Sequence, residues 1–197
     1  MINYHQAVVG LLGEPRNVFA SHEAWRPIEE SLGVSLPQDY KDLIDTYAPV
    51  RVNGHLCLEH PANDFYSLGT WITETVDDFQ ETDWESGFSC PGYEESGPIF
   101  GSRGGIIPLA CTDRGEYIFL APGTDSDKWR ILSCGRGWKD FYEHLMTFSE
   151  WLYRYLMGED MFDPGQGVFY AGPVRLESLP IAAGDLQSEW FGPDRGI

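Results

Sequence analysis

The sequence predicts an α+β domain with helices near the N-terminus, a central antiparallel sheet of several strands, and a C-terminal helix packed on the sheet. Three observations predict this class. Two early segments repeat apolar residues at helical spacing, three short β-prone runs separated by turns follow them, and a longer stretch of helical periodicity comes next. The chain has 197 residues, of which 42% are hydrophobic, so it is long enough for one domain with a packed core.

Short helices are expected in the first fifty residues. Residues 2–13 are largely apolar and end in a glycine. The next helix is capped by Ser21, places Pro27 in its first turn and stops at Gly33. Another helix starts at Pro37. Its apolar stripe consists of Tyr40, Leu43, Ile44 and Tyr47.

The middle of the chain is expected to form the sheet. Residues 55–59 alternate weakly, and residues 66–72 contain two aromatic residues and a glycine. Three apolar or β-prone runs follow at residues 106–110, 117–121 and 129–134, and turn-forming residues separate them. Three runs joined by two turns predict an antiparallel meander.

A long helix is expected from about Trp138 to Met157. Its apolar stripe would consist of Trp138, Phe141, Leu145, Phe148, Leu152, Tyr155 and Leu156. This assigns residues 1–158 to the main domain and residues 159–197 to a C-terminal extension rich in Gly and Pro. The extension holds too many apolar residues for a free linker, so we expect it to pack on the domain, with a strand near Val168–Tyr170.

The cysteines and histidines give little support to a metal site. Cys57, Cys90, Cys111 and Cys134 include no closely spaced pair, so we expect free thiols rather than a zinc site or a disulfide framework. An alternative is a metal site at His55, Cys57 and His60, which would need further ligands from distant residues such as Cys111 or Cys134. Phosphate-binding and dinucleotide-binding motifs are absent, so no cofactor is expected.

The charge balance bears on the kind of partner. The sequence has 13 basic and 31 acidic residues, which gives a net charge of −18. Such a surface repels phosphate backbones, so a basic protein or a small ligand is favoured over nucleic acid. No apolar run approaches the ~18 residues that span a membrane. The first fifteen residues have no basic residue before the apolar stretch, so no signal peptide is expected, and the cytoplasm is the simplest location.

The acidic charge is concentrated in one segment. Residues 52–102 contain no Lys or Arg, and five carboxylates fall within residues 77–85. The predicted partner-binding residues are Asp77, Asp78, Phe79, Glu81, Asp83, Trp84 and Glu85. The carboxylates would attract a cationic protein, and the two aromatic side chains would anchor it. A solvated face that keeps the protein soluble is the alternative, and a calcium loop lacks the required acidic spacing.

Residues 25–44 resemble the opening motif of the SUKH superfamily, which includes the Smi/Knr-like domain. The matching elements are Trp25, Ile28-Glu29, Leu32-Gly33 and Leu36-Pro37-Gln38-Asp39-Tyr40-Lys41. The later part is also similar, through Ile107-Pro108-Leu109-Ala110, Asp113 with Gly115-Glu116-Tyr117-Ile118, Trp129, and Phe148-Ser149-Glu150-Trp151-Leu152. Family members usually have a glycine soon after the aromatic residue at Tyr47, where this chain has Ala48-Pro49. The resemblance covers roughly residues 21–158.

The resemblance implies an α+β fold and a non-enzymatic role. Many bacterial members are immunity proteins that bind and neutralise a cognate toxin, often a nuclease, and eukaryotic relatives act as regulatory interaction modules. The family shares no catalytic residues, so none is assigned here. We therefore expect a binding protein that neutralises a basic toxin stoichiometrically. The alternatives are a regulatory scaffold of the same fold and a hydrolase that uses paired carboxylates such as Asp77 and Glu81.

Overall fold

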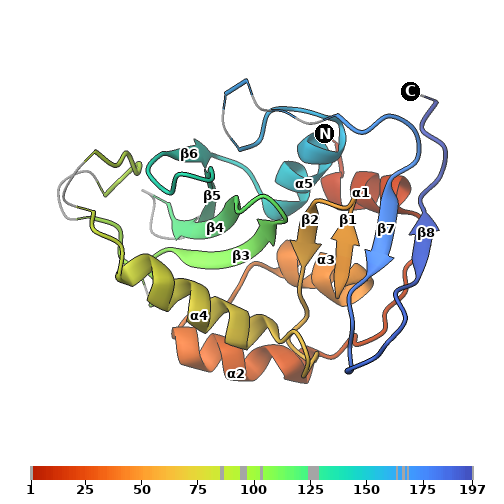
Figure 1. Cartoon of the computed structure of the whole chain (residues 1–197), viewed down its shortest axis with the longest axis horizontal. Coiled ribbons are helices and arrows are strands. Elements are labelled where there is room, and N and C mark those ends of the chain that lie inside the picture. Colours follow the sequence, from red (N-terminus) through yellow and green to blue (C-terminus); the bar gives the residue numbers. More distant parts are fainter. Residues whose placement is uncertain are drawn as a thin grey trace.

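The fold is an α+β arrangement, as the sequence predicts. The computed structural model describes residues 2–84, 87–93, 97–102, 104–123, 129–162, 164–165, 167 and 169–196. Within these residues five helices accompany one eight-stranded sheet, whose order is β6-β5-β4-β3-β2-β1-β7-β8 (Figure 1). All neighbouring strands run antiparallel.

The three N-terminal helices are confirmed. They are α1 (Tyr4–Leu12), α2 (His22–Leu32) and α3 (Gln38–Tyr47). Gly33 ends α2 in the left-handed conformation, with φ of 68°, which glycine adopts without steric cost. The predicted place of Pro27 was wrong. Because α2 begins at His22, Pro27 lies inside the helix, where it lacks the N–H that would pair with the carbonyl of Glu23.

The sheet contains the predicted meander. The strands are β1 (Val50–Val52), β2 (Leu56–Leu58), β3 (Ile107–Thr112), β4 (Tyr117–Pro122), β5 (Trp129–Cys134), β6 (Phe141–His144), β7 (Arg175–Ser178) and β8 (Glu189–Phe191). Strands β3, β4 and β5 pair in sequence order, which confirms the meander. Strand β2 lies within the weakly alternating segment 55–59.

One predicted strand was wrong. Residues 66–72 do not form a strand, because most of this segment belongs to α4 (Leu68–Gln80). The buried residues of α4 are Leu68, Ile72, Thr75 and Phe79. Their spacing of i, i+4, i+7 and i+11 is helical, and it becomes visible only in a window longer than the segment that suggested a strand.

The long C-terminal helix is also shorter than predicted. Helix α5 spans Phe148–Leu156 and begins at Thr147, whose side chain accepts a hydrogen bond from the backbone N–H of Glu150. The preceding residues pair with β5 as strand β6. Trp138 has a positive φ of 56°, which a right-handed helix cannot contain, and Leu145 is 80% exposed.

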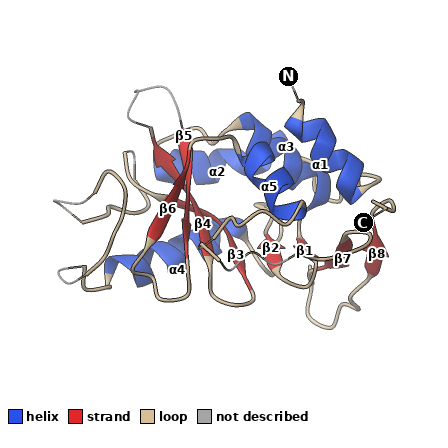
Figure 2. Ribbon diagram, turned by 90° about the horizontal axis from the view of Figure 1, so that it is seen from above, coloured by secondary structure: helices blue, strands red, loops and turns tan. Residues whose placement is uncertain are grey.

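The helices cover the sheet unevenly. Figure 2 shows α1, α3 and α5 on one side of the sheet and α4 on the other. Helix α5 packs against α1 and α3, with the rings of Tyr4 and Tyr153 5.6 Å apart and those of Tyr40 and Phe148 4.9 Å apart. On the side that faces the viewer in Figure 1, none of the described helices covers β1, β2 and β7.

The C-terminal residues complete the sheet beside β1. Strand β7 pairs with β1 and β8 pairs with β7, and both Val174 and Leu176 are fully buried in the main core. The strand expected at Val168–Tyr170 does not form at Phe169 and Tyr170, and Val168 lies outside the described residues. The strands of this region therefore come later in the chain than predicted.

Among the described residues, no helix has the length and apolar character needed to cross a bilayer.

Candidate functional site

The predicted acidic segment forms a stripe along the second half of α4. Glu74, Asp77, Asp78 and Glu81 follow one another at i, i+3, i+4 and i+7, and all four residues are exposed. We call these four residues the acidic stripe. Within the part of the chain that the structure describes, none of them forms an ion pair. Asp83 is also exposed, and Glu85 lies outside the described residues.

The acidic stripe is placed where it weakens its own helix. The C-terminal end of a helix carries partial negative charge, so a carboxylate there costs about 0.3–1 kcal/mol at low ionic strength. Helix α4 has no basic residue in its last turn to offset this cost. Like charges at i and i+4, as in Asp77 and Glu81, add a smaller repulsion. The stripe therefore does not stabilise the fold, and its carboxylates are available to a cation outside the chain.

The two aromatic residues of the predicted site do not lie on the surface beside the carboxylates. Phe79 is 0% exposed, and its ring centroid lies 4.6 Å from that of Trp138 and 5.2 Å from that of Phe119. Trp84 is half-buried, stacks on Phe79, and donates a hydrogen bond from Nε1 to the Phe79 carbonyl at 2.9 Å. The prediction of Phe79 as a surface anchor was wrong, because its helical spacing places it in a second core between α4 and β4–β6.

A groove between α2 and α4 borders the acidic stripe. Its volume is about 470 Å³. Its lining includes Pro27, Ile28, Ser31, Ile72, Thr73 and Val76. Thr73 lies one helical turn before Asp77, so the groove meets the stripe at this point. The apolar surface nearest the carboxylates is therefore this groove rather than the ring of Phe79.

The residues of the alternative metal site have separate partners. His55 is 2% exposed, and its ring nitrogens lie 2.8 Å from the Tyr155 hydroxyl and 3.0 Å from a Glu116 carboxylate oxygen. His60 instead pairs with Asp45 at 3.0 Å. Across the ranges that the structure describes, no group of three or more His, Cys, Asp or Glu side chains is arranged to hold a metal ion.

The His55 network joins three parts of the fold. Burial raises the pKa of Glu116, but hydrogen bonds from His55 and Thr112 outweigh this effect and keep it below its usual value. The Thr112 hydroxyl donates to the same carboxylate at 2.7 Å. The network ties the β3–β4 turn and the end of the β1–β2 turn to α5, which is a structural role.

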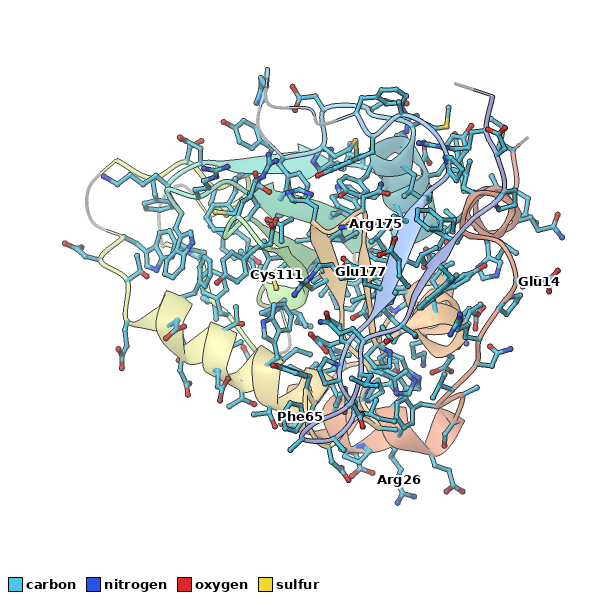
Figure 3. The ribbon with its side chains drawn as sticks, turned by 45° about the vertical axis from the view of Figure 1, so that its right-hand side comes forward. Glu14, Arg26, Phe65, Cys111, Arg175 and Glu177 are labelled. Carbon is cyan, nitrogen blue, oxygen red and sulfur yellow. The ribbon has the colours of Figure 1, made fainter. Side chains whose placement is uncertain are left out.

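A second polar cluster lies on the same side of the sheet as α4, centred on β1 and β2, which no described helix covers on this side. Glu177, Arg51, Cys57 and Cys111 sit directly opposite one another on β7, β1, β2 and β3. We call these four residues the cysteine row. Figure 3 shows Cys111 and Glu177 on this side of the sheet, with Arg175 beside them. Sequence analysis missed the row, because Cys57 and Cys111 are far apart in the chain and meet only through strand register.

The two thiols of the cysteine row have unequal acidity. A hydrogen bond from Cys111 lowers the pKa of the Cys57 thiol below its usual range; burial opposes this shift, and the Arg51 guanidinium adds to it. The interaction with Cys57 raises the pKa of Cys111. Burial also raises the pKa of the neighbouring Glu59 carboxyl to about 8.

Comparison with known proteins identifies one family. The model of the SMI1 / KNR4 family (SUKH-1) matches residues 20–154. This range begins just before α2 and ends within α5, so it contains the acidic stripe, the meander and three members of the cysteine row. It ends before β7 and β8. No curated protein and no solved structure matches the chain.

Proposed function

Since the chain belongs to the SMI1/KNR4 family (SUKH-1), we propose that it is an immunity protein that neutralises a cognate toxin by stoichiometric binding. The family is known for immunity proteins of polymorphic toxin systems. The proposed partner is a basic protein, such as a nuclease, and the proposed contact is the acidic stripe of α4. A nuclease presents Lys and Arg to its phosphate substrate, and a row of carboxylates can occupy that surface.

The placement of the acidic stripe is the observation that carries this proposal. Three of the four exposed carboxylates, Asp77, Asp78 and Glu81, lie in the last turn of α4 or at its C-cap, where they are least favourable for stability. A positive surface on the partner would offset the repulsion among these carboxylates. Binding would therefore relieve an unfavourable interaction that is present in the free protein. At physiological ionic strength the Debye length is about 8 Å, so the stripe would steer a partner mainly at short range.

The exposure of the stripe supports binding over the alternative of hydrolysis. Carboxylates that act as general acids and bases work at positions shielded from water, where burial shifts their pKa values toward the working pH. Asp77 and Glu81 are exposed on the outer surface of a helix. The regulatory scaffold of the same fold has no observation that favours it, and the experiment below separates it from the immunity protein.

The test measures binding kinetics against an inactive variant of the toxin encoded by the neighbouring gene. The stripe variant carries Asp77→Lys, Asp78→Lys and Glu81→Lys. A matched control carries Glu14→Lys, Glu23→Lys and Glu189→Lys. These three exposed carboxylates lie in the segment after α1, on α2 and on β8, respectively. Both variants change the net charge equally. We expect the stripe variant to reduce the association rate constant about tenfold more than the control does, with the difference shrinking at high salt.

A second variant tests the groove next to the stripe. Thr73 lines the groove and is exposed, so Thr73→Trp should fill the groove without disturbing the core. If an apolar side chain of the partner occupies the groove, this variant should speed dissociation about tenfold, because central apolar contacts control dissociation. Circular dichroism of each variant provides the folding control.

The outcomes separate the proposals. Equal association rates for the stripe and control variants would reject the acidic stripe as the contact surface. Toxin activity that persists in the presence of excess wild-type protein would reject the immunity function. Binding to a host protein instead of the toxin would favour the regulatory scaffold.

A further inference from the structure

We propose that Cys57 and Cys111 form a thiol modification site, in which a hydroperoxide oxidises Cys57 and Cys111 then closes a disulfide with it. The proposal rests on the cysteine row and is independent of the acidic stripe. It adds a covalent chemistry to a protein whose proposed function is binding.

The register of β2 and β3 places the two thiols directly opposite each other. Asp113 donates its backbone N–H to the carbonyl of His55 at 2.9 Å, so the position two residues along the ladder, Cys57 and Cys111, is also a hydrogen-bonded pair. The Cα atoms of such a pair are about 5.5 Å apart, within the range of roughly 4.4–6.8 Å that disulfides span.

The same register predicts that the disulfide is easily reversed. Side chains of a hydrogen-bonded pair are farther apart than those of a non-hydrogen-bonded pair. Formation of the disulfide therefore requires the two strands to shift. A disulfide formed away from its relaxed geometry is more readily reduced. The ladder between β2 and β3 is short, with two paired positions and the adjoining hydrogen bond from Asp113 to His55, which eases the adjustment.

Charged neighbours favour the thiolate of Cys57 over that of Cys111. Arg51 on β1 lies directly opposite Cys57, on the side of β2 away from β3, and its guanidinium lowers the pKa of the Cys57 thiol. The acidic groups nearby are Glu59 on β2, Asp113 after β3 and Glu177 on β7. Burial raises the pKa of Glu59 to about 8, so this carboxyl keeps its proton at neutral pH and does not repel a thiolate. The cation Arg51 then stabilises the thiolate of Cys57.

Access also separates this pair from the other two cysteines. Cys57 and Cys111 are both half-buried. Strand β2, which carries Cys57, has no described helix over it on the side that faces the viewer in Figure 1. Cys90 and Cys134 are each 0% exposed in the second core. Burial raises the pKa of Cys134, which keeps its thiol protonated. The chain therefore carries an internal control for thiol reactivity.

The chemistry balances with one molecule of hydrogen peroxide, the simplest hydroperoxide. The Cys57 thiolate attacks one peroxide oxygen, the O–O bond breaks, and Cys57 becomes a sulfenic acid while hydroxide leaves and takes a proton. Cys111 then loses its proton and attacks the Cys57 sulfur. The S–S bond forms, the S–O bond breaks, and the second oxygen leaves as water. In total, two thiols are oxidised to a disulfide and one hydrogen peroxide is reduced to two water molecules.

The experiment treats the native full-length chain with hydrogen peroxide at pH 7 and maps its peptides without reduction. We expect one Cys57–Cys111 disulfide, detected as the loss of two hydrogen atoms and restored by dithiothreitol, while Cys90 and Cys134 remain thiols. In Cys111→Ala the reaction should stop at the sulfenic acid of Cys57, which dimedone traps.

Alkylation by iodoacetamide tests the role of Arg51. Wild-type Cys57 should react faster than the other three cysteines at pH 7, with a midpoint below the ordinary thiol value of about 8.5. Arg51→Gln should slow this reaction about tenfold and move the midpoint upward, while circular dichroism checks that the variant folds.

Several results would overturn the proposal. Peroxide that leaves Cys57 as a sulfenic or sulfinic acid in the wild type, without a disulfide, would remove Cys111 from the chemistry. Equal modification of all four cysteines would show unfolding rather than a site. Alkylation of wild-type Cys57 that is no faster than that of Cys111 would reject the activation of its thiol, whatever the behaviour of Arg51→Gln.

Discussion

The family motif has a physical explanation at the level of single residues. The carboxylate of Glu29 accepts hydrogen bonds from the backbone N–H of Leu36 at 2.9 Å and from Lys41 Nζ at 2.8 Å. The indole N–H of Trp25 donates to Asp45 at 2.9 Å. These contacts join α2, the turn after it and α3. These motif residues therefore hold α2 and α3 together.

Tyr40 connects this helix pair to the sheet. Its ring packs against Trp25 and Phe148, and its hydroxyl donates to the carbonyl of Leu109 at 2.9 Å. Leu109 lies in the register shift between β3 and β4, where the ladder is interrupted. The hydroxyl thus satisfies a buried carbonyl next to a defect of the ladder.

Two substitutions at Tyr40 separate packing from hydrogen bonding. Tyr40→Phe keeps the ring and should lower the free energy of unfolding by about 1–3 kcal/mol, because a buried carbonyl loses its partner. Tyr40→Ala should cost about 3–5 kcal/mol, because it also leaves a cavity. Urea denaturation measures both. A Tyr40→Phe variant as stable as the wild type would show that the hydrogen bond to Leu109 contributes nothing.

At the scale of the element, α4 combines two incompatible demands. Its buried side ends in Phe79, which holds the second core together, and its exposed side carries the acidic stripe. The carboxylates in the last turn interact unfavourably with the helix dipole. The exposed side of α4 is therefore destabilising, while its buried side is well packed. This separation of the two sides allows the surface to change without loss of the fold.

The stripe variant should therefore be more stable than the wild type. Replacing Asp77, Asp78 and Glu81 by Lys reverses the sign of the interaction with the helix dipole and should raise the free energy of unfolding by about 1 kcal/mol in total. Thermal denaturation at low and high salt measures this, and the gain should shrink as salt screens the charges. Unchanged or lower stability would mean that the carboxylates support the fold, which would weaken the argument for binding.

At the scale of the whole molecule, the C-terminal residues behave as part of the cooperative unit. Leu176 of β7 and Val174, which precedes this strand, belong to the main core, and β7 covers the edge of β1. The Arg195 guanidinium donates to the backbone carbonyls of Leu156, Tyr170 and Gly172, which ties the end of the chain to the end of α5.

Truncation after Gly158 should therefore damage the fold. Among the described residues it removes five buried hydrophobic side chains, Met161, Phe162, Val174, Leu176 and Leu179. It also leaves β1 as an unpaired edge, so we expect a lower melting temperature and aggregation in size-exclusion chromatography. Leu176→Ala should lower the free energy of unfolding by about 2–5 kcal/mol. Leu186→Ala, at a position 94% exposed, should change it by less than about 0.5 kcal/mol. A truncated chain that melts with the wild type would show that residues 159–197 are dispensable.

The amino-acid sequence by itself determined the elements whose signals are local. The three N-terminal helices follow from periodicity, and glycines mark the ends of the first two. The β3–β5 meander follows from β-prone runs between turns. The family motif is contiguous, so it was visible without the structure. The acidic segment at residues 77–85 was also visible, because its carboxylates are close in sequence, but their arrangement with Glu74 as a stripe on a helix was not predicted.

Only the tertiary structure decided the features that depend on long-range pairing. The residues of β6 fit a helical stripe, yet they form a strand because β5 offers an edge to pair with. Phe79 looked like a surface anchor, yet side chains from β4, β5 and β6 enclose it. Cys57 and Cys111 meet through the register of two strands that are distant in sequence. Register is set by the hydrophobic pattern of the whole sheet and by its turns, so no local pattern around either cysteine could show it.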